Sequence, residues 1–396
     1  MNEIRNPHSE ILLQRYMRIN IIGGGPAGLY LAILMKKADA SHEINVYERN
    51  GPDDTFGWGV VFSGKTLANL READAESHGE ITKSFQAWDN VDVVHGAEKI
   101  SIHGNSFSGI ARIRLLKILQ ARATQLGVQV HFHSEVNDTE KLRANADLLV
   151  AADGVNSTVR RHYENQFGPS LDFRPNRYIW YGTNQLFHGL TLTFRERAGG
   201  VFAAHSYKFN DTTSTFIVEC DPLTWTNAGF DRLDDEQTRE YLAEVFRQDL
   251  NGHPLLTNNS KWIQFLLVKN TRWYVDNAVM LGDALHTAHF SIGSGTKLAL
   301  EDAIALAACL NEANSVSDAL SQFESSRRPI IEDYQAAAFE SMTWFENARN
   351  YTHLSVVELA FSLMMRSGRV SYEDLRKRDP EFIRRYEESR GAQSVP

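Results

Sequence analysis

The chain is poor in cysteine: Cys220 and Cys309 are the two cysteines in 396 residues. They lie far apart and outside any CxxC or Cys/His spacing, which excludes a disulfide framework and predicts no metal site. The formal net charge is −9 and basic runs are short, so no nucleic-acid surface is expected. No apolar run reaches the roughly 20 residues of a membrane span. These absences favour a globular protein of the reducing cytoplasm, large enough for two domains.

Residues 19–48 have the order of a dinucleotide-binding unit. The apolar run 19–22 predicts a buried strand, residues 26–37 have helical periodicity, and residues 44–47 predict a second strand. A glycine-rich turn, GGGPAG, joins the first strand to the helix. The alternative is an ordinary turn between a strand and a helix, but the complete order of strand, glycine turn, helix and second strand favours a bound dinucleotide.

Three glycines of this turn, Gly23, Gly25 and Gly28, have GxGxxG spacing. They suit a tight turn, a close approach of pyrophosphate to the backbone, and close packing of helix on strand, respectively. Glu48 ends the second strand, where a carboxylate can accept hydrogen bonds from both ribose hydroxyls. This acid argues against a 2′-phosphate, so FAD and NAD both remain open.

Two later segments repeat the strand, turn and helix pattern. Residues 146–161 predict a strand running into Asp153 and a helix opening at Asn156 or Ser157. Residues 278–310 predict a strand ending at Asp283, a loop containing histidines, and a long helix after glycines. Residues 110–126 predict another helix, with Arg112 near its start. Each helix N-terminus can face a phosphate or another polar group.

The middle of the chain has a different period. Residues 178–221 alternate polar and apolar side chains, as strands of an antiparallel sheet do, and residues 234–250 predict one amphipathic helix. This pattern predicts a second domain inserted into the first. Residues 316–347 are expected to be helical, residues 367–396 to form a charged surface tail, and residues 1–16 to be a short extension or an upstream start.

Three motifs, GGGPAG with Glu48, ADGVNSTVR, and GDALHTAHFSIGSGTKLALEDA, resemble the single-component FAD-dependent aromatic hydroxylases. Within that family, GWGVVFS, HSYKF and the C-terminal FSLMMRSGRVSYEDLRKRDPEF are most similar to hydroxylases of aromatic acyl-CoA thioesters, such as the salicylyl-CoA 5-hydroxylases and the monooxygenase part of 2-aminobenzoyl-CoA monooxygenase/reductase. RYIWYGTNQLF and STFIVEC also resemble the indole hydroxylase of violacein biosynthesis.

The resemblance implies an α/β fold: a Rossmann-like FAD-binding domain of the para-hydroxybenzoate hydroxylase type, an inserted antiparallel-sheet substrate domain, and C-terminal helices. It implies an FAD-binding domain over residues 17–165 and 270–345, a substrate domain over 166–269, and a C-terminal helical tail over 346–396. Residues implied to contact FAD are Gly23, Gly25, Pro26, Ala27, Gly28, Glu48, Arg49, Arg112, Asp153, Asp283, Gly293, Ser294, Gly295, Thr296 and Lys297.

The resemblance also implies the reaction. NADH or NADPH would reduce FAD, O₂ would form a flavin C4a-hydroperoxide, and an electron-rich ring would attack its distal oxygen. The ring would belong to an aromatic acyl-CoA such as salicylyl-CoA, hydroxylated at position 5, or alternatively to an untethered indole-like or other natural-product intermediate. A second complete GxGxxG unit is lacking, so we expect the nicotinamide to dock transiently.

Five residues are candidates for the substrate side, because a neutral histidine or a tyrosine can accept a hydrogen bond or proton from a ring hydroxyl or amino group. The alternative for each is a core residue with its hydrogen bonds satisfied, which is the more frequent role of tyrosine and histidine in sheets. His289 has the best position, between the acidic turn and the glycine turn, where the family usually has proline. His205 ranks second, before Tyr181, Tyr207 and His286.

Other flavin functions remain as alternatives. A flavin-dependent halogenase shares the opening motif, but its WxWxIP signature is absent from this sequence. A flavin reductase or saturase would reduce its substrate without oxygen. A non-catalytic FAD-binding regulator would bind FAD without ligand-stimulated oxidation of NADH.

Overall fold

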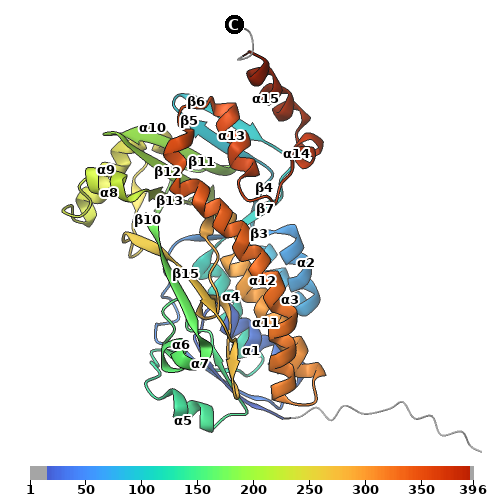
Figure 1. The fold of residues 1–396 in the computed structure, drawn as a ribbon. Coiled ribbons are helices and arrows are strands. Elements are labelled where there is room, and N and C mark those ends of the chain that lie inside the picture. Colours follow the sequence, from blue (N-terminus) through green and yellow to red (C-terminus); the bar gives the residue numbers. More distant parts are fainter. Residues whose placement is uncertain (1–15, 393–396) are drawn as a thin grey trace, which may run out of the picture.

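The computed structural model describes residues 16–392 (Figure 1), so the predicted extension and the last residues of the predicted tail fall largely outside the described part. One sheet has the strand order β16-β17-β9-β1-β2-β8, and its neighbours are parallel except β16 with β17. Its strands are β1 (Arg18–Ile22), β2 (Glu43–Tyr47), β8 (Gln129–His131), β9 (Leu148–Ala151), β16 (Tyr274–Val275) and β17 (Ala278–Met280).

The second sheet has eight strands in the order β14-β10-β13-β12-β11-β5-β6, with β15 also paired to β10. It is antiparallel except where β5 meets β11. Its strands are β5 (Val91–His95), β6 (Glu98–Ile102), β10 (Pro169–Thr183), β11 (Leu190–Arg197), β12 (Gly200–Lys208), β13 (Ser214–Cys220), β14 (Leu255–Leu256) and β15 (Ile263–Asn270). A small antiparallel sheet, β3 (Gly59–Ser63), β7 (Phe107–Ala111) and β4 (Gln86–Trp88), completes the strands.

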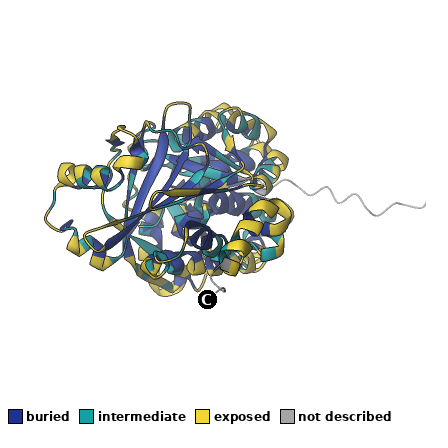
Figure 2. Cartoon of the chain, turned by 90° about the horizontal axis from the view of Figure 1, so that it is seen from above, coloured by how far each residue is buried: buried dark blue, intermediate teal, exposed yellow. Residues whose placement is uncertain are grey.

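Helices cover both sheets, and the buried residues follow the strands through the centre of the molecule (Figure 2). The long helix α12 runs from the parallel sheet up to the antiparallel sheet (Figure 1). The helices are α1 (Pro26–Ala38), α2 (Gly64–Ala73), α3 (Ala75–Thr82), α4 (Arg112–Gln125), α5 (Thr139–Ala144), α6 (Thr158–His162), α7 (Glu164–Phe167), α8 (Pro222–Asn227), α9 (Asp235–Val245), α10 (Arg247–Leu250), α11 (Gly295–Glu312), α12 (Val316–Glu346), α13 (Val356–Met365), α14 (Tyr372–Arg378) and α15 (Pro380–Ala392), with 3₁₀ turns η1 (Gly282–Ala284), η2 (Phe290–Ile292) and η3 (Ala348–Tyr351).

The α/β prediction and most predicted elements are confirmed, including the opening strand–helix–strand unit and the strands predicted over residues 178–221. The single helix predicted over 234–250 is wrong. It is broken at Phe246, a buried residue whose backbone leaves the helical conformation between α9 and α10. The sequence pattern continues through this break because both short helices use the same apolar face.

The predicted segment boundary at residue 165 also differs from the observed sheets. Strands β5 and β6 come from the first segment, yet β5 pairs in parallel with β11 of the inserted sheet. Between β4 and β7, the chain therefore leaves the small three-stranded sheet, adds β5 and β6 to the eight-stranded sheet, and returns. A pairing between segments this far apart leaves no local signal in the sequence.

The predicted surface tail is also wrong. Helices α14 and α15 follow α13, and their residues Leu375, Phe382 and Ile383 are buried in one apolar cluster with Ile100 and Ile102 of β6. The charged residues that suggested a tail occupy the outer faces of these helices. Helices α14 and α15 therefore pack at the β6 end of the antiparallel sheet (Figure 1).

The described residues contain no helix that is both long enough and apolar enough to cross a membrane. Within the same part of the chain, no group of three or more His, Cys, Asp or Glu side chains could hold a metal ion.

Candidate active site

The turns predicted to bind a cofactor meet at one edge of the parallel sheet. Ile22 of β1 lies beside Ala151 of β9, and Ala151 lies beside Met280 of β17. Because these strands are parallel, the turns that follow them leave the sheet at the same edge. The structure thereby brings together segments separated by more than a hundred residues of sequence.

Each glycine of the first turn is required, or allows space, for a different geometric reason. Gly23 has a φ of +110°, and a Cβ there would lie 2.2 Å from the Ala152 carbonyl oxygen. A Cβ on Gly28 would lie 2.2 Å from the Gly23 carbonyl oxygen, so helix α1 can pack on β1 only with glycine at this position. A Cβ on Gly25 would meet nothing within 4 Å and would extend into open space. Gly25 thus lines a cradle that the protein itself leaves empty.

Glu48 is held firmly at the end of β2. Its carboxylate accepts hydrogen bonds from the Gly24 N–H at 2.7 Å and from the backbone and side-chain nitrogens of Asn50 at 2.8 Å each. Glu48 and the exposed Arg49 line a cavity of 220 Å³ that reaches the glycine turn. The carboxylate is therefore fixed in place and faces space into which a ligand can fit.

Asp153 lies across the same cavity, at the end of β9. Its Oδ2 accepts hydrogen bonds from the Thr158 N–H at 2.7 Å and the Thr158 hydroxyl at 3.0 Å, at the start of α6. Its Oδ1 is buried and has no hydrogen-bond partner among the described residues. Ser157 forms the N-cap of α6, as one of the two predicted alternatives had it. The orphaned oxygen is a polar group available to a ligand.

Arg112 joins this cavity to a second, larger one of 610 Å³, because it lines both. It is the first residue of α4, and its backbone N–H donates to the Trp58 carbonyl at 2.7 Å. Burial lowers the pKa of Arg112, and the charge of Asp283 opposes that shift. Burial raises the pKa of Asp283, against the charge of Arg112. A cation that lines both cavities and an acid that lines the larger one thus act on each other's pKa.

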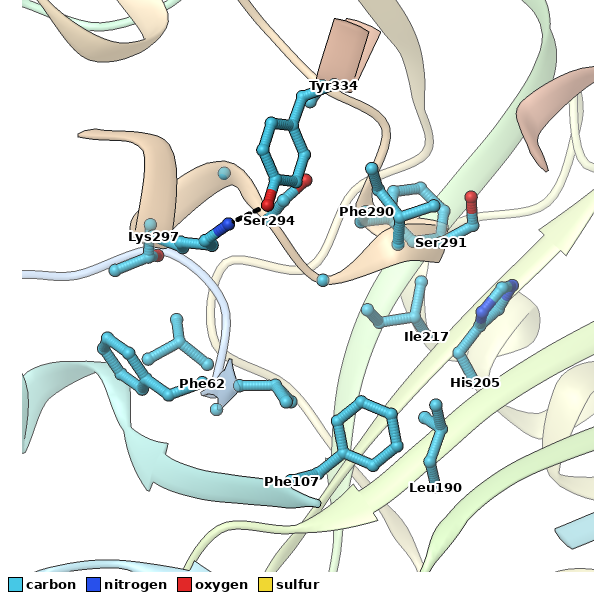
Figure 3. A pocket seen from close by; sticks show the side chains of 18 of the residues that line it. Phe62, Phe107, Leu190, His205, Ile217, Phe290, Ser291, Ser294, Lys297 and Tyr334 are labelled. Carbon is cyan, nitrogen blue, oxygen red and sulfur yellow. Dashed lines mark hydrogen bonds between the residues drawn. The ribbon is translucent and has the colours of Figure 1, made fainter. Parts of the chain in front are cut away.

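The N-terminus of α11 forms a wall of the larger cavity. Gly293 has a φ of +62°, which turns the chain into the helix, and the Ser294 hydroxyl is buried without a partner in the described structure. The first-turn N–H groups of a helix have no intrahelical acceptor. Lys297 lies within this turn, donates to the Tyr334 hydroxyl, and has its Nζ 3.9 Å from the centre of the Tyr334 ring (Figure 3).

Apolar side chains from five different elements, β3, β7, β11, β13 and η2, line the larger cavity. Figure 3 shows Phe107 beside Leu190, with Phe62 to the left, Ile217 to the right and Phe290 above them. Such a lining excludes water and fits a flat aromatic group. Strand β3 supplies part of this lining, through Val60, Val61 and Phe62.

His205 is the predicted substrate-side residue that lies on this wall without its ring nitrogens being fully engaged by the core (Figure 3). Its Nε2 lies 3.3 Å from Oε2 of Glu219, and Oε1 of Glu219 accepts a hydrogen bond from Asn176 at 2.8 Å. Burial favours a raised pKa for Glu219, but the hydrogen bond from His205 and the nearby His289 outweigh it and hold the pKa below its usual range. Glu219 is therefore a carboxylate behind His205.

The remaining substrate-side predictions have other surroundings. Tyr207 lines the cavity, but its hydroxyl donates to the Gly59 carbonyl at 2.8 Å. Tyr181 lies on the opposite face of the sheet, in an apolar cluster with Phe216. His286 has its Nε2 2.8 Å from Asp302 in a buried polar network. The Tyr207 hydroxyl and the His286 imidazole are thus engaged by the protein, and Tyr181 is a core residue on the face away from the cavity.

His289 lies behind the cavity wall rather than on it. Its Nδ1 is 2.8 Å from the Ser291 hydroxyl, its Nε2 is 4.0 Å from Glu219, and its ring packs on Phe290 with centroids 4.1 Å apart. Burial lowers its pKa to about 4, with the charge of Glu219 opposing that shift. The predicted direct approach of His289 to the substrate is thus replaced by contact through Phe290 and Glu219.

Two functional candidates were not predicted from the sequence. Glu219 could have been found, because it is the one acid at an inward position of the apolar strand STFIVEC. Arg366 lines the cavity from the end of α13, and burial lowers its pKa to about 10, so it stays charged at neutral pH. Its position depends on how the C-terminal helices fold back, which leaves no local signature.

The two joined cavities fit the FAD that the motifs predict. The smaller one has an empty cradle at Gly25, a fixed carboxylate at Glu48 and an orphaned oxygen on Asp153. The larger one offers an apolar chamber beside the N-terminus of α11. Ribose, pyrophosphate and a flat ring system need these three kinds of surroundings.

Comparison with known proteins agrees with this reading. Residues 16–338 match the family described as FAD binding domain. The chain is 42% identical over 373 residues to salicyloyl-CoA 5-hydroxylase of Streptomyces sp., covering 90% of this chain and 72% of that relative. It is 35% identical over 354 residues to protodeoxyviolaceinate monooxygenase of Chromobacterium violaceum, covering 87% and 93%.

Among solved structures, 2-methyl-3-hydroxypyridine-5-carboxylic acid oxygenase aligns with a TM-score of 0.69 at 20% identity, over 92% of this chain and 98% of that one. This likeness shows the fold of a flavin hydroxylase with an inserted sheet. The family match, the relatives and the fold lead to one identification. This chain belongs to the FAD-dependent aromatic monooxygenases, as its three motifs predicted.

Proposed function

We propose that the enzyme uses NADH or NADPH and O₂ to hydroxylate an electron-rich aromatic ring held as a CoA thioester, with salicylyl-CoA hydroxylated at position 5 as the first candidate. One oxygen atom enters a ring C–H bond. The other leaves as water, formed with the hydride of NAD(P)H and one proton. When bound, FAD supplies the redox chemistry, accepting the hydride and activating O₂.

The observation that carries the proposal is the larger cavity. It is lined by the turns proposed for FAD, by apolar side chains, and by arginines from the C-terminal segment. A ring in the apolar part would lie next to the flavin, while a polar extension could leave past the arginines. The relative that is 42% identical is named for hydroxylation of a CoA thioester.

The FAD contacts are part of this proposal. Gly23, Gly25, Gly28 and Glu48 would hold the ADP half, Arg112 and Asp153 the pyrophosphate region, and Asp283 the ribityl chain. The empty cradle at Gly25 supports the first assignment. Backbone N–H groups at the start of α11 would face the flavin pyrimidine, on the wall formed by residues 293–297.

His205 would accept the hydrogen bond or proton of the ring substituent. A carboxylate can only accept hydrogen bonds, so the contact with Glu219 assigns the hydrogen to Nε2 and leaves the lone pair on Nδ1. Accepting the hydrogen bond or the proton of a ring hydroxyl or amino group makes the ring more nucleophilic. The fixed tautomer would thus prepare the substrate for oxygen transfer.

Arg366 would bind the carbonyl next to the ring. Its guanidinium donates to the Ser341 hydroxyl at 2.8 Å, the Leu363 carbonyl at 2.6 Å and the Ser291 carbonyl at 2.8 Å. Three of its five N–H groups are thereby used, and the other two remain for a ligand. A buried cation of this kind suits a thioester carbonyl held beside the chamber.

The same cation would also bind a free carboxylate, which supports a second candidate. In that reading the enzyme hydroxylates an untethered indole-like or other natural-product intermediate. The 35% identity to protodeoxyviolaceinate monooxygenase favours this alternative, with less weight than the 42% identity to salicyloyl-CoA 5-hydroxylase gives the first candidate.

The deciding experiment measures NADH and NADPH oxidation by the FAD-loaded enzyme in air, followed by product mass. The substrates are salicylyl-CoA, 2-aminobenzoyl-CoA, their free acids and a set of indoles. A gain of one oxygen on a thioester alone supports the proposal. Oxygen transfer to a free acid or an indole, with no thioester accepted, overturns it in favour of the second candidate.

A further inference from the structure

One wall of the larger cavity is basic although the protein as a whole carries a formal net charge of −9. Arg366, Arg369 and Arg378 all come from the short stretch between the end of α13 and the end of α14, and all three line the cavity. We call these three residues the arginine rim. Asn105, in the connection between β6 and β7, lines the same cavity.

The three arginines differ in how their charges are used. Arg366 is the most enclosed and donates to neutral oxygens. Arg369 donates to Asp333 at 2.7 Å and lies 4.6 Å from the centre of the Tyr334 ring. Arg378 is exposed, and its guanidinium forms neither a hydrogen bond nor an ion pair with any residue in the described part of the chain. Arg378 thus has no ion-pair partner there, and its charge helps to lower the pKa of Asp374 on the same helix.

The acids nearest to Arg378 in sequence are occupied elsewhere. Asp374, one turn earlier on α14, accepts hydrogen bonds from Ser371 at the N-cap. Glu373 pairs with Arg376 at 2.7 Å. Asp379 accepts hydrogen bonds from the backbone N–H groups of His103 and Phe382. None of these acids is therefore paired with the Arg378 guanidinium.

The base of Arg378, by contrast, is fixed. Gly104 has a φ of +75°, and a Cβ there would lie 2.8 Å from Cβ of Arg378 and 2.9 Å from its carbonyl oxygen. The β6–β7 connection therefore packs directly on this residue. The Asp379 carboxylate ties the same connection to the start of α15 through the His103 N–H at 2.8 Å. A rigid backbone with a free cationic head is the arrangement of an anion-binding residue.

We infer that the CoA handle of the substrate leaves the cavity along the α13–α14 segment, and that Arg378, assisted by Arg369, binds its phosphate groups. This inference rests on the proposed function. The forked guanidinium matches phosphate oxygens in a bidentate geometry. Arg366, deeper on the same wall, would lie next to the thioester, so the rim follows the handle outward from the ring.

The test compares two thioesters of the same aromatic acid: the CoA thioester, and the N-acetylcysteamine thioester, which carries no phosphate. The change Arg378→Ala is expected to raise KM for the CoA thioester about tenfold, since a charge-assisted hydrogen bond is lost. It is expected to leave KM for the phosphate-free thioester unchanged. Added salt should weaken the use of the CoA thioester more in the wild type than in the variant.

The matched control is Arg376→Ala, which removes the same charge from the outer face of α14, where Arg376 pairs with Glu373. This control should change KM for neither thioester. Equal effects of Arg378→Ala on both thioesters, or no effect on the CoA thioester, would overturn the inference.

A separate measurement distinguishes this inference from the proposed function. Calorimetry of free CoA with the FAD-loaded enzyme should give binding that Arg378→Ala weakens about tenfold. If the wild type hydroxylates both thioesters with equal KM, the handle site is wrong while thioester hydroxylation stands. If it hydroxylates neither thioester and binds no CoA, the proposed function and the handle site are both wrong.

Discussion

Glu219 shows how one buried residue can set the chemistry of its neighbour. Its side chain is 2% exposed, so an unpaired carboxylate there would be strongly unfavourable. The hydrogen bond from His205 and the contact with Asn176 compensate for its burial. As a consequence, His205 has one fixed tautomer on the cavity wall, whereas a free imidazole exchanges between two.

Replacing Glu219 by glutamine should therefore impair hydroxylation more than folding. The variant keeps its shape but loses the charge that fixes His205, so we expect kcat to fall roughly ten- to a hundredfold. Its rate should recover partly at higher pH, where the ring hydroxyl ionises by itself. The measurements are product formed per NADH consumed, across a pH series, and FAD content.

The control for this change is Glu196→Gln, which removes an exposed carboxylate from β11 of the same sheet. That variant should match the wild type. A Glu219→Gln enzyme with unchanged kcat, coupling and pH profile would contradict the positioning role.

His289 predicts a pH effect on stability. Burial lowers its folded-state pKa to about 4, below the unfolded value of about 6.5. Between these values the unfolded chain binds the proton more strongly, so stability falls as pH drops through 6.5 and levels off below 4. We expect this residue to cost about 2 kcal/mol of unfolding free energy between pH 7 and pH 5.

Urea unfolding of the wild type and of His289→Gln at both pH values measures this contribution. Glutamine cannot titrate, so the variant should lose about 2 kcal/mol less than the wild type over the same interval. Glu219 and His205 face His289 and contribute to the pH dependence of both proteins. Parallel losses in the two proteins would show that His289 is not the group responsible.

At the scale of elements, the six residues of the glycine-rich turn meet two requirements, one for packing of the helix and one for binding of a ligand. Gly28 allows α1 to pack on β1, whereas Gly25 leaves space for a ligand. The same GxGxxG pattern therefore contains a folding glycine and a binding glycine. The geometry around each one, rather than the pattern, distinguishes them.

The two glycine-to-alanine changes should accordingly affect different properties: Gly28→Ala the stability of the fold, and Gly25→Ala the binding of FAD. Gly28→Ala brings its Cβ 2.2 Å from a carbonyl oxygen, so we expect a loss of stability of at least about 1–3 kcal/mol. Gly25 has a φ of −78°, which alanine adopts without strain. Gly25→Ala should keep the melting temperature of the FAD-free protein and weaken FAD binding about tenfold or more. Thermal melting and fluorescence titration with FAD test the pair, and an unchanged FAD affinity in Gly25→Ala would contradict the cradle.

At the scale of the whole molecule, the cavity exists because three distant parts of the chain close around it. The parallel sheet supplies the glycine and acidic turns, the antiparallel sheet supplies His205 and Glu219, and the C-terminal segment supplies the arginine rim. Helices α13–α15 pack on β5 and β6, which themselves reach the second sheet from the first segment (Figure 1).

The packing of α15 predicts that the C-terminus is part of the folded core. Phe382 is 2% exposed, so Phe382→Ala should cost about 3–5 kcal/mol of unfolding free energy. Phe173→Ala is the matched control, because Phe173 is 63% exposed on β10 and should lose less than about 0.5 kcal/mol. Denaturant unfolding compares them. Equal, small losses would mean that α15 is a surface tail after all.

Local patterns in the sequence were sufficient for the elements around the glycine and acidic turns. Apolar runs, helical periodicity and glycine spacing act over a few residues, so they predicted β1, α1, β2 and β9 and the turns between them. The parallel pairing of these strands then brings Glu48, Asp153 and Asp283 to one edge, which the same reasoning could foresee.

Only the tertiary structure decided the substrate side. A histidine in a strand or loop looks the same in sequence whether it faces a cavity, as His205 does, or lies behind its wall, as His289 does. The answer depends on which face of β12 and β13 is covered by α12, η2 and the C-terminal helices. Those contacts join segments far apart in the chain, and their energies come from burial that no short stretch of sequence contains.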